Sequence, residues 1–517
     1  MRTKILAWGL AAGLSLSGLS GSYADDVPTT LELAVLHSRG LQRIALPIAK
    51  GDRTYQQLWD QKFAAIFAYC DIDGNGTLNP AEAARLPAAA ALREATYSGF
   101  APVIKSAPKW EDLGGTEGGS ITREQLAAYY RSHDVGQPII GIGIAPFTND
   151  LTAALLARLD ADQDGKVSRD EWSKAEAVLD QLDQNDDQMI GAGELVAGVF
   201  YPGTSASFLL QVASDDRPPL AEAMHDFPVS RLPQQPGDIA WTHRLKSQAS
   251  FPKQLHDTAS VTAWRDASPD QIWNVQLVVD NQTQAIVVEG VGEKEQTTEL
   301  PYVKLGDTWL TVRSDPGQMV ERLEGLLTSS REQFADSDED QDGVLSQAEW
   351  SASGKGFGSA MVAMMDRDGN QQLTKAELEG WLTLQEEIAS GLVMVTIVDC
   401  GSGVLELLDT DRNGALSRRE LRNAVARLEE AGCVQGDTVD LERLPRQLLF
   451  TISIGPPDSV LGKIQRRGPD WFLSMDRNQD GDVSEAEFVG GAEAFQSLDV
   501  NGDKLITFDE IENLKVD

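Results

Sequence analysis

The segment DADQDGKVSRDE, residues 160–171, places acidic side chains at loop positions 1, 3 and 5, a glycine at position 6 and a glutamate at position 12. Alternate side chains of a tight loop point inward, so their oxygens can surround a hard cation, which takes six to eight oxygen ligands. Gly165 permits the left-handed turn that redirects the chain. The carbonyl of Lys166 can then reach the cation, and Glu171 can supply two oxygens. The predicted chemistry is binding of a cation such as calcium.

Four more segments repeat this spacing in full, so the pattern is more than a chance feature of an acidic chain. They are residues 71–82, 338–349, 409–420 and 476–487. The shared pattern, D-x-[DN]-x-[DN]-G-x5-E, resembles the calcium loop of the EF-hand family. The resemblance implies a helix on each side of every loop and calcium as the cofactor.

Three further loops keep the acidic or amide positions but have another residue in place of the glycine. They are residues 183–194, 366–377 and 499–510, with Gln188, Gln371 and Lys504 at position 6. A residue other than glycine with positive φ costs on the order of 1 kcal/mol. We therefore expect these loops to bind calcium, but more weakly.

The expected ligands occupy positions 1, 3, 5, 7 and 12 of the eight loops, with position 7 contributing its backbone carbonyl. In chain order they are Asp71, Asp73, Asn75, Thr77, Glu82, Asp160, Asp162, Asp164, Lys166, Glu171, Asp183, Asn185, Asp187, Met189, Glu194, Asp338, Asp340, Asp342, Val344, Glu349, Asp366, Asp368, Asn370, Gln372, Glu377, Asp409, Asp411, Asn413, Ala415, Glu420, Asp476, Asn478, Asp480, Asp482, Glu487, Asp499, Asn501, Asp503, Leu505 and Glu510. An acidic loop can also be a solvated surface turn, but the repeated ligand spacing favours metal binding.

EF-hands usually work in face-to-face pairs, so the resemblance also predicts partners. The loops without glycine start 23, 28 and 23 residues after an intact loop, with which each is expected to pair. The offset of 23 from the loop at 409–420 leads to residues 432–443, where a glycine and an arginine replace the end carboxylates. We expect a metal-free partner there. Residues 114–125 are a second metal-free candidate, as partner of the loop at 71–82.

Short apolar runs with high strand propensity precede several loops, at residues 139–146, 309–316, 393–400 and 448–455. We expect strands from successive units to join in sheets, with a set of separate buried strands as the alternative. Residues 202–320 contain no such loop, but a proline-rich stretch and three segments typical of antiparallel strands. The predicted fold class is α+β, with repeated paired EF-hand helix-loop-helix modules joined by short strands and a small β-rich middle domain. The expected divisions are a signal peptide at 1–24, EF-hand pairs at 25–135 and 136–201, the proline-rich segment plus β-rich domain at 202–320, and EF-hand pairs at 321–392, 393–447 and 448–517, with a degenerate second hand in the first and fourth pairs.

The N-terminus predicts export. It reads MRTK, then a short apolar stretch, then SYADD, which is typical of a secretory signal cleaved after Ala24. An uncleaved membrane anchor is the alternative, but a bilayer span needs ~20 apolar residues. We expect a periplasmic or extracellular protein with no membrane span after cleavage. Three cysteines exclude a disulfide-rich scaffold; Cys400 and Cys433 are the likelier pair, although sequence leaves the connectivity open.

The formal net charge is −36, and much of it lies in the loops. Such an excess of negative charge excludes nucleic acid as a partner. No histidine has metal-ligand or triad spacing, and no catalytic motif occurs, so no catalytic residue is predicted and the chain is not expected to be an enzyme. The first hypothesis is an exported structural or interaction protein, with calcium ions and another exported protein or a cell-surface component as partners. The alternatives are a calcium-responsive sensor and a calcium-stabilised enzyme whose activity would reside in residues 202–320.

Overall fold

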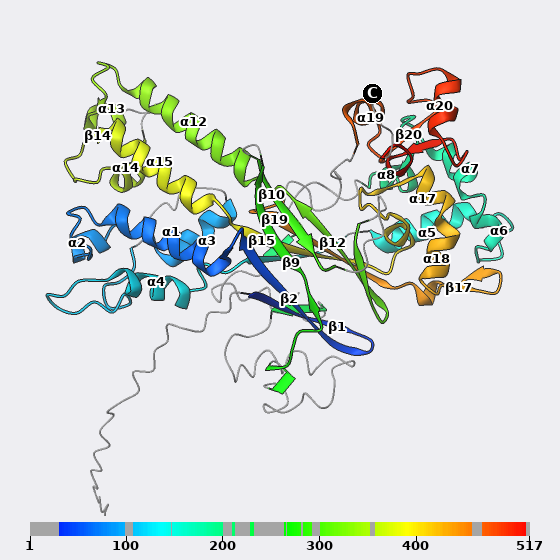
Figure 1. The fold of residues 1–517 in the computed structure, drawn as a ribbon, viewed down its shortest axis with the longest axis horizontal. Helices are drawn as coiled ribbons and strands as arrows, with labels where there is room; N and C mark the ends of the chain where they lie inside the picture. Colours follow the sequence, from blue (N-terminus) through cyan, green and yellow to red (C-terminus); the bar gives the residue numbers. More distant parts are fainter. Residues whose placement is uncertain are drawn as a thin grey trace, which may run out of the picture.

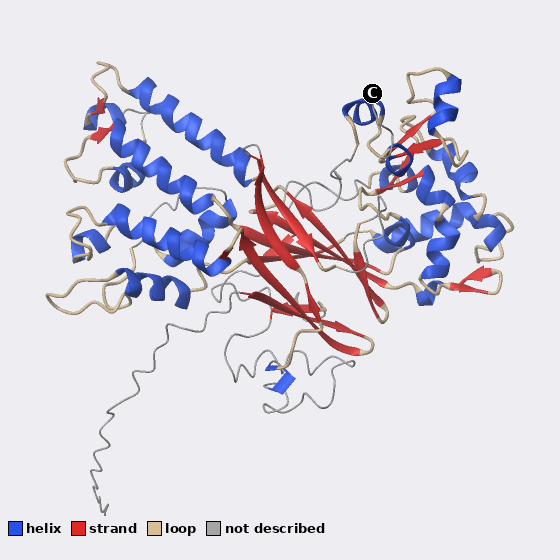
Figure 2. Ribbon diagram, viewed as in Figure 1, coloured by secondary structure: helices blue, strands red, loops and turns tan. Residues whose placement is uncertain are grey.

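The architecture is a pair of central β-sheets with a helical lobe at each end (Figures 1 and 2). The computed structural model describes residues 30–98, 107–145, 147–199, 209–211, 228–231, 263–264, 266–280, 283–291, 300–351, 357–457 and 468–512. The predicted signal peptide and most of the proline-rich stretch lie outside these residues. Among the described helices, none is long and apolar enough to cross a membrane.

The first sheet is built from two hairpins. β1 (Thr30–His37) and β2 (Gly40–Lys50) form one, β9 (Asn274–Asp280) and β10 (Thr283–Glu289) form the other, and β9 joins β2 in parallel. Because side chains alternate along a strand, Val275 and Leu277 point into the core together. Three short strands complete the sheet: β3 (Arg53–Thr54), β7 (Val229–Arg231) and β8 (Gln271–Ile272).

The second sheet joins segments from far apart in the sequence. All four apolar runs predicted as strands lie in it, as strands of successive units joined in one sheet. Its order is β11 (Tyr302–Leu305), β12 (Thr308–Asp315), β19 (Arg446–Ile454), β15 (Val393–Gly401), β4 (Ile139–Ile144) and β6 (Leu209–Gln211). Trp273 of the segment between β8 and β9 meets Phe450 of β19 edge to face, with ring centroids 5.3 Å apart. The apolar faces of the two sheets thus share one core.

The β-rich middle domain predicted within residues 202–320 does not form a sheet of its own. Its first described hairpin, β9 with β10, belongs to the first sheet, and its second, β11 with β12, belongs to the second. A two-stranded hairpin buries too little apolar surface to be stable alone. Each hairpin therefore joins a sheet that also contains strands from outside this region, pairing with β2 in the first sheet and with β19 in the second.

The first lobe, on the left of Figure 1, shares its core with the sheets. A capping box between Thr54 and Gln57 begins its first helix, which stacks Phe63 on Tyr130 at 5.3 Å between ring centroids. The lobe contains α1 (Tyr55–Cys70), α2 (Pro80–Ala83), α3 (Ala89–Ser98), α4 (Arg123–Ser132), α12 (Met319–Ser337), β13 (Val344–Leu345), α13 (Gln347–Trp350), α14 (Ser359–Met365), β14 (Leu373–Thr374) and α15 (Lys375–Ala389).

The second lobe, on the right of Figure 1, has an apolar core of its own around Trp172 and Leu416. It contains α5 (Thr148–Leu159), α6 (Arg169–Trp172), α7 (Ala175–Leu179), η1 (Asp180–Leu182), β5 (Met189–Gly191), α8 (Ala192–Leu195), α16 (Val404–Leu408), β16 (Ala415–Ser417), α17 (Arg418–Arg422), α18 (Ala424–Glu430), β17 (Val434–Gln435), β18 (Thr438–Val439) and η4 (Leu441–Arg443). The C-terminal elements lie beside it around a small cluster with Phe472 and Ile506, namely α19 (Asp470–Met475), β20 (Asp482–Ser484), α20 (Ala492–Leu498), β21 (Leu505–Thr507) and α21 (Phe508–Ile511).

The three cysteines are free and buried, so the suggested disulfide between Cys400 and Cys433 is wrong. The two residues lie in different elements: Cys400 is in β15 and its thiol contacts the carbonyl of Val398, whereas the thiol of Cys433 contacts the carbonyl of Arg443. Their position on either side of one repeat unit did not bring the sulfur atoms together.

Candidate metal centres

The eight predicted loops share one local design. Where a helix precedes the loop, its C-cap is the first loop residue, as at Asp160 after α5. In most loops the next helix begins after position 9, whose side chain caps it. In the loop at 160–171, the hydroxyl of Ser168 accepts from the amide of Glu171, and the Glu171 carboxylate accepts from the Ser168 amide at 2.7 Å. This capping box fixes the glutamate at position 12 before any ion binds.

Position 6 has positive φ in all eight loops. The glycines lie close together, from +81° at Gly76 to +86° at Gly414. The three other residues adopt the same left-handed conformation, at +64° for Gln188, +64° for Gln371 and +69° for Lys504. The turn predicted for glycine is therefore kept at a cost on the order of 1 kcal/mol in each of these loops. That cost is the physical reason to expect weaker binding there.

The backbone already orients the carboxylates at positions 1 and 12. In the loop at 160–171, Asp160 accepts from the amides of Asp164 at 3.1 Å and Gly165 at 3.0 Å. Glu171 also accepts from the amide of Ala161 at 2.7 Å. Hydrogen bonds from the backbone and hydroxyl of Ser168 lower the pKa of Glu171 to about 2. The loop thus presents ionised oxygen atoms in fixed directions.

Five loops bring three carboxylates close enough for one ion, with ligand oxygens all within 4.8 Å of one another. These groups are Asp71, Asp73 and Glu82; Asp160, Asp162 and Glu171; Asp338, Asp340 and Asp342; Asp366, Asp368 and Glu377; and Asp409, Asp411 and Glu420. The loops at 183–194, 476–487 and 499–510 have asparagine at position 3, so an amide oxygen replaces one carboxylate there. Their backbone turns are the same, as in the bond from the Asp503 amide to Asp499 at 3.1 Å.

The loop at 409–420 gives the sharpest test of whether a cation fits. Asp409, Asp411 and Glu420 are at most 3% exposed, and burial raises the pKa of each, that of Glu420 to about 7. Arg412, at position 4, turns to the second sheet and donates to Gln447 at 2.7 Å. Clustered buried carboxylates are costly unless a positive charge compensates them. An all-oxygen set of this kind fits calcium.

Backbone bridges join the loops at position 8. Leu345 lies opposite Leu373 in β13 and β14, and an isolated bridge joins Leu78 to Ile121. In the C-terminal elements, β20 and β21 join the loops at 476–487 and 499–510. These bridges join segments that the sequence predicts as partners: two pairs from their offsets, and the metal-free candidate at 114–125 as partner of the loop at 71–82.

The other two predicted pairings are wrong. The loop at 183–194 pairs with the loop at 409–420 through β5 and β16, and the loop at 160–171 pairs with residues 432–443 through a bridge from Ser168 to Thr438. The cause is the second sheet, in which β4 and β15 are parallel neighbours. The helices that follow them, α5 and α16, pack side by side. Each unit's first loop therefore faces the other unit's second.

Contacts across neighbouring pairs were missed by sequence reasoning. Arg85, after the loop at 71–82, donates to the carbonyls of Asp366 and Arg367 at 2.6 Å each. Arg367 in turn donates to the carbonyl of Tyr69 at 3.1 Å. The first lobe's two loop pairs are thereby joined through loop backbone. We call these hydrogen bonds of Arg85 and Arg367 the joint between the two loop pairs. An isolated arginine beside a loop gives no sequence signal of its partner, so the joint could not be predicted.

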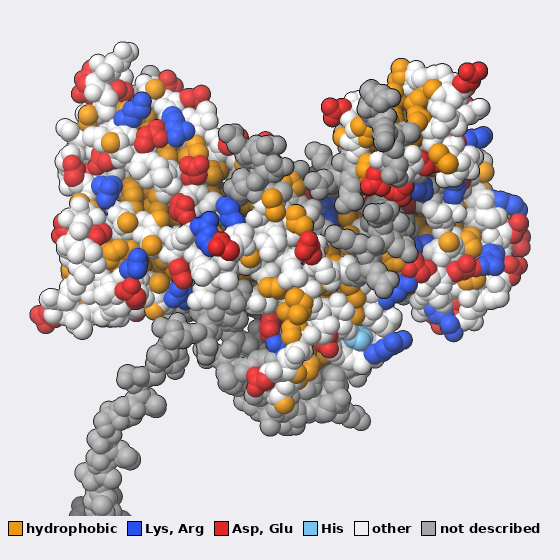
Figure 3. All heavy atoms as spheres, viewed as in Figure 1, with side chains coloured by type: hydrophobic (Ala, Val, Ile, Leu, Met, Phe, Trp, Pro, Cys, Tyr) orange, Lys and Arg blue, Asp and Glu red, His pale blue; other side chains and the backbone are white. Residues whose placement is uncertain are grey.

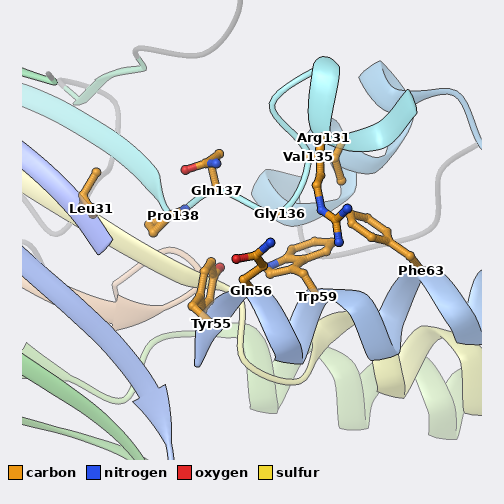
Figure 4. A pocket seen from close by; sticks show the side chains of 10 residues that line it. All are labelled: Leu31, Tyr55, Gln56, Trp59, Phe63, Arg131, Val135, Gly136, Gln137 and Pro138. Carbon is orange, nitrogen blue, oxygen red and sulfur yellow. The ribbon is translucent and has the colours of Figure 1, made fainter. Parts of the chain in front are cut away.

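Apart from the loops, a small pocket lies between α1 and the segment leading to β4. Figure 4 shows Tyr55, Trp59 and Phe63 of α1 facing Arg131 and Gly136. Its volume is about 10 Å³, which is the size of one water molecule. The pocket is therefore too small for an organic ligand and does not compete with the acidic loops as a candidate binding site.

Comparison with known families agrees with the geometry. A family model described as EF hand matches residues 152–174, 403–426 and 470–489. Each match contains the whole of one loop with intact spacing, 160–171, 409–420 or 476–487, together with flanking residues. These three segments are EF-hands. A search of curated proteins and a search of solved structures found no match. The EF-hand matches and the acidic groups together indicate calcium binding. On the face seen in Figure 3, acidic side chains are spread over both lobes.

Proposed function

We propose that this chain is an exported calcium-binding structural protein in which about eight EF-hand loops, once filled, fix the shape of the two lobes. The observation that supports this role is the use of loop backbone as a joint between loop pairs. In the first lobe, Arg85 binds the carbonyls of Asp366 and Arg367, which are positions 1 and 2 of another loop. Ordering a loop around an ion therefore orders the neighbouring pair as well.

The joints favour a structural role over a sensor. A sensor EF-hand opens on calcium and exposes a methionine-rich groove. The one methionine cluster of this chain lies at residues 361–365, where Met364 and Met365 are buried in the core. Calcium-loaded EF-hands whose loops are hydrogen-bonded to one another cannot open independently. We infer that calcium stabilises one shape and that the partner, an exported protein or cell-surface component, meets a rigid surface.

Counting bound ions is the first test. Native mass spectrometry with and without a chelator should show about eight calcium ions per chain, and a count below five would contradict the proposal. Glu82→Gln removes a bidentate ligand from an exposed loop and should lower the count by one. Thr77→Ser, in the same loop, keeps the backbone carbonyl of position 7 and serves as the matched control with no ion lost.

Protease resistance and an apolar dye separate the structural role from the sensor. The structural role predicts that the chelated chain is cleaved quickly and that calcium protects it without increasing dye binding. A chelated chain that resists protease and binds more dye after calcium addition would favour the sensor. Export is tested separately, by fractionating cells that express the chain and sequencing the N-terminus of the exported product. Cleavage after Ala24 is expected, and a cytoplasmic, uncleaved product would contradict it.

A further inference from the structure

Helix α17 lies where loops from two different pairs meet, the pair of 183–194 with 409–420 and the C-terminal pair. It follows directly on the loop at 409–420, and Glu420, the bidentate position of that loop, is one of its residues. Three arginines on the same short helix each contact a different segment. Arg418 donates to Asp180 at 2.9 Å, ahead of the loop at 183–194. The other two, Arg419 and Arg422, contact the C-terminal EF-hand pair.

Arg419 connects two loops by its charge. It donates to the carboxylate of Asp482, at position 7 of the loop at 476–487, at 2.8 Å. Asp482 is 1% exposed, and its second oxygen is buried with no hydrogen-bond partner among the described residues. Glu420 follows Arg419 directly in the chain. The residue that pairs with the loop at 476–487 is therefore bonded in the chain to the bidentate ligand of the loop at 409–420.

Arg422 and Asn478 complete the connection. Arg422 forms a two-bond ion pair with Glu176 of α7, at 2.8 and 2.7 Å, and also donates to the carbonyl of Asp503 at 2.5 Å. Asp503 is position 5 of the last loop. In the other direction, Asn478, at position 3 of the loop at 476–487, donates to the carbonyl of Asp187 at 2.8 Å. The oxygen of the Asn478 side-chain amide accepts from the backbone amide of Asp480, in the same loop, at 3.2 Å.

We propose that α17 couples metal binding in the loop at 409–420 to metal binding in the loop at 476–487, so that filling the first raises the affinity of the second. The proposal rests on the proposed function. When Glu420 holds an ion, α17 is fixed, and Arg419 and Arg422 then hold the C-terminal loops in their binding geometry. An ion that enters a pre-ordered loop loses less free energy to ordering. Coupling of this kind is reciprocal.

Terbium luminescence can follow the second loop selectively. Terbium replaces calcium in oxygen sites, and Trp471, in the helix that leads into the loop at 476–487, can sensitise it. The signal lost in a Trp471→Phe chain isolates this loop from the others. Glu420→Gln should shift the midpoint of the Trp471-dependent signal to higher terbium concentration by on the order of fivefold or more. An unchanged midpoint would overturn the coupling.

Arginine variants test whether α17 carries the coupling between the two loops. In an Arg419→Gln, Arg422→Gln background, Glu420→Gln should no longer shift the midpoint, whereas in an Arg418→Gln background the shift should remain. A full shift in the double-arginine background would show that α17 does not carry the coupling. Terbium signal from the remaining loops reports whether each variant is folded. A wild-type chain with no Trp471-dependent signal would instead show that the loop does not bind, which refutes the proposed function at this loop and the coupling with it.

Discussion

Replacing Arg85 by methionine should open the joint between the two loop pairs of the first lobe. Methionine keeps the apolar stem, so the change removes the guanidinium and its bonds to the carbonyls of Asp366 and Arg367. A hydrogen bond involving a charged group contributes roughly 1.5 to 3 kcal/mol. Arg85 is half-buried, so we discount each bond to about 1 to 1.5 kcal/mol for solvent screening. The expected loss is about 2 to 3 kcal/mol of local stability.

Hydrogen–deuterium exchange with mass spectrometry measures this loss locally, which a global unfolding curve of a two-lobed chain does not. Peptides covering residues 366–377 should exchange about 30- to 150-fold faster in the calcium-loaded variant, because about 1.4 kcal/mol corresponds to tenfold. Arg331→Met is the matched control. Arg331 pairs with Glu379 at 2.9 Å, but the two side chains are 50% and 38% exposed, and such pairs contribute about 0.2 to 1 kcal/mol. If the two substitutions speed exchange equally, the proposed joint between the two loop pairs is refuted.

Four further predictions concern stability and reactivity. Burial lowers the pKa of Lys62 from 10.5 to about 8, so the charged form of Lys62 destabilises the folded chain. The free energy of unfolding, measured by urea denaturation, should therefore rise between pH 8 and 10.5. This rise should be absent in Lys62→Met. A thiol reagent should modify none of the three buried cysteines in the native chain and all three after unfolding. Gly317→Ala should be strongly destabilising, because φ is +73° and the added carbon would lie 2.1 Å from the carbonyl oxygen of Ile454. Gly325→Ala, in an open part of α12, should stabilise the chain by about 0.5 to 1 kcal/mol in the same denaturation assay.

Local features could be predicted because they depend on neighbouring residues. Ligand spacing within twelve residues determines a loop, and the loop turn at Gln188 or Lys504 is the same as at glycine because the flanking hydrogen bonds are the same. The capping box of Ser168 and Glu171 also had a sequence signal, a serine three residues before a glutamate. It was missed because the glutamate was considered only as a ligand.

Long-range features could not be predicted for an equally physical reason. Whether the loop at 183–194 pairs with its neighbour or with a distant loop depends on which strands lie beside each other in the second sheet. Strand neighbours are set by the burial of whole faces, which no local pattern encodes. The same holds for Asp482, whose partner Arg419 lies 63 positions away. The sequence assigned a role only to the backbone carbonyl of Asp482, as the ligand at position 7, whereas its side chain pairs with Arg419.

The exchanged pairing of the second lobe has a consequence for how the chain folds. Asn413 and Met189 touch in the pair formed by β5 and β16, although 224 positions separate them. Closing so long a stretch of chain is entropically costly, and contacts of high sequence separation slow folding. The partners of the loops at 160–171 and 183–194 are synthesised much later, so these two loops stay unpaired until then. In a chain exported as proposed, this delay would keep the second lobe open while the polypeptide is still passing out of the cell's interior.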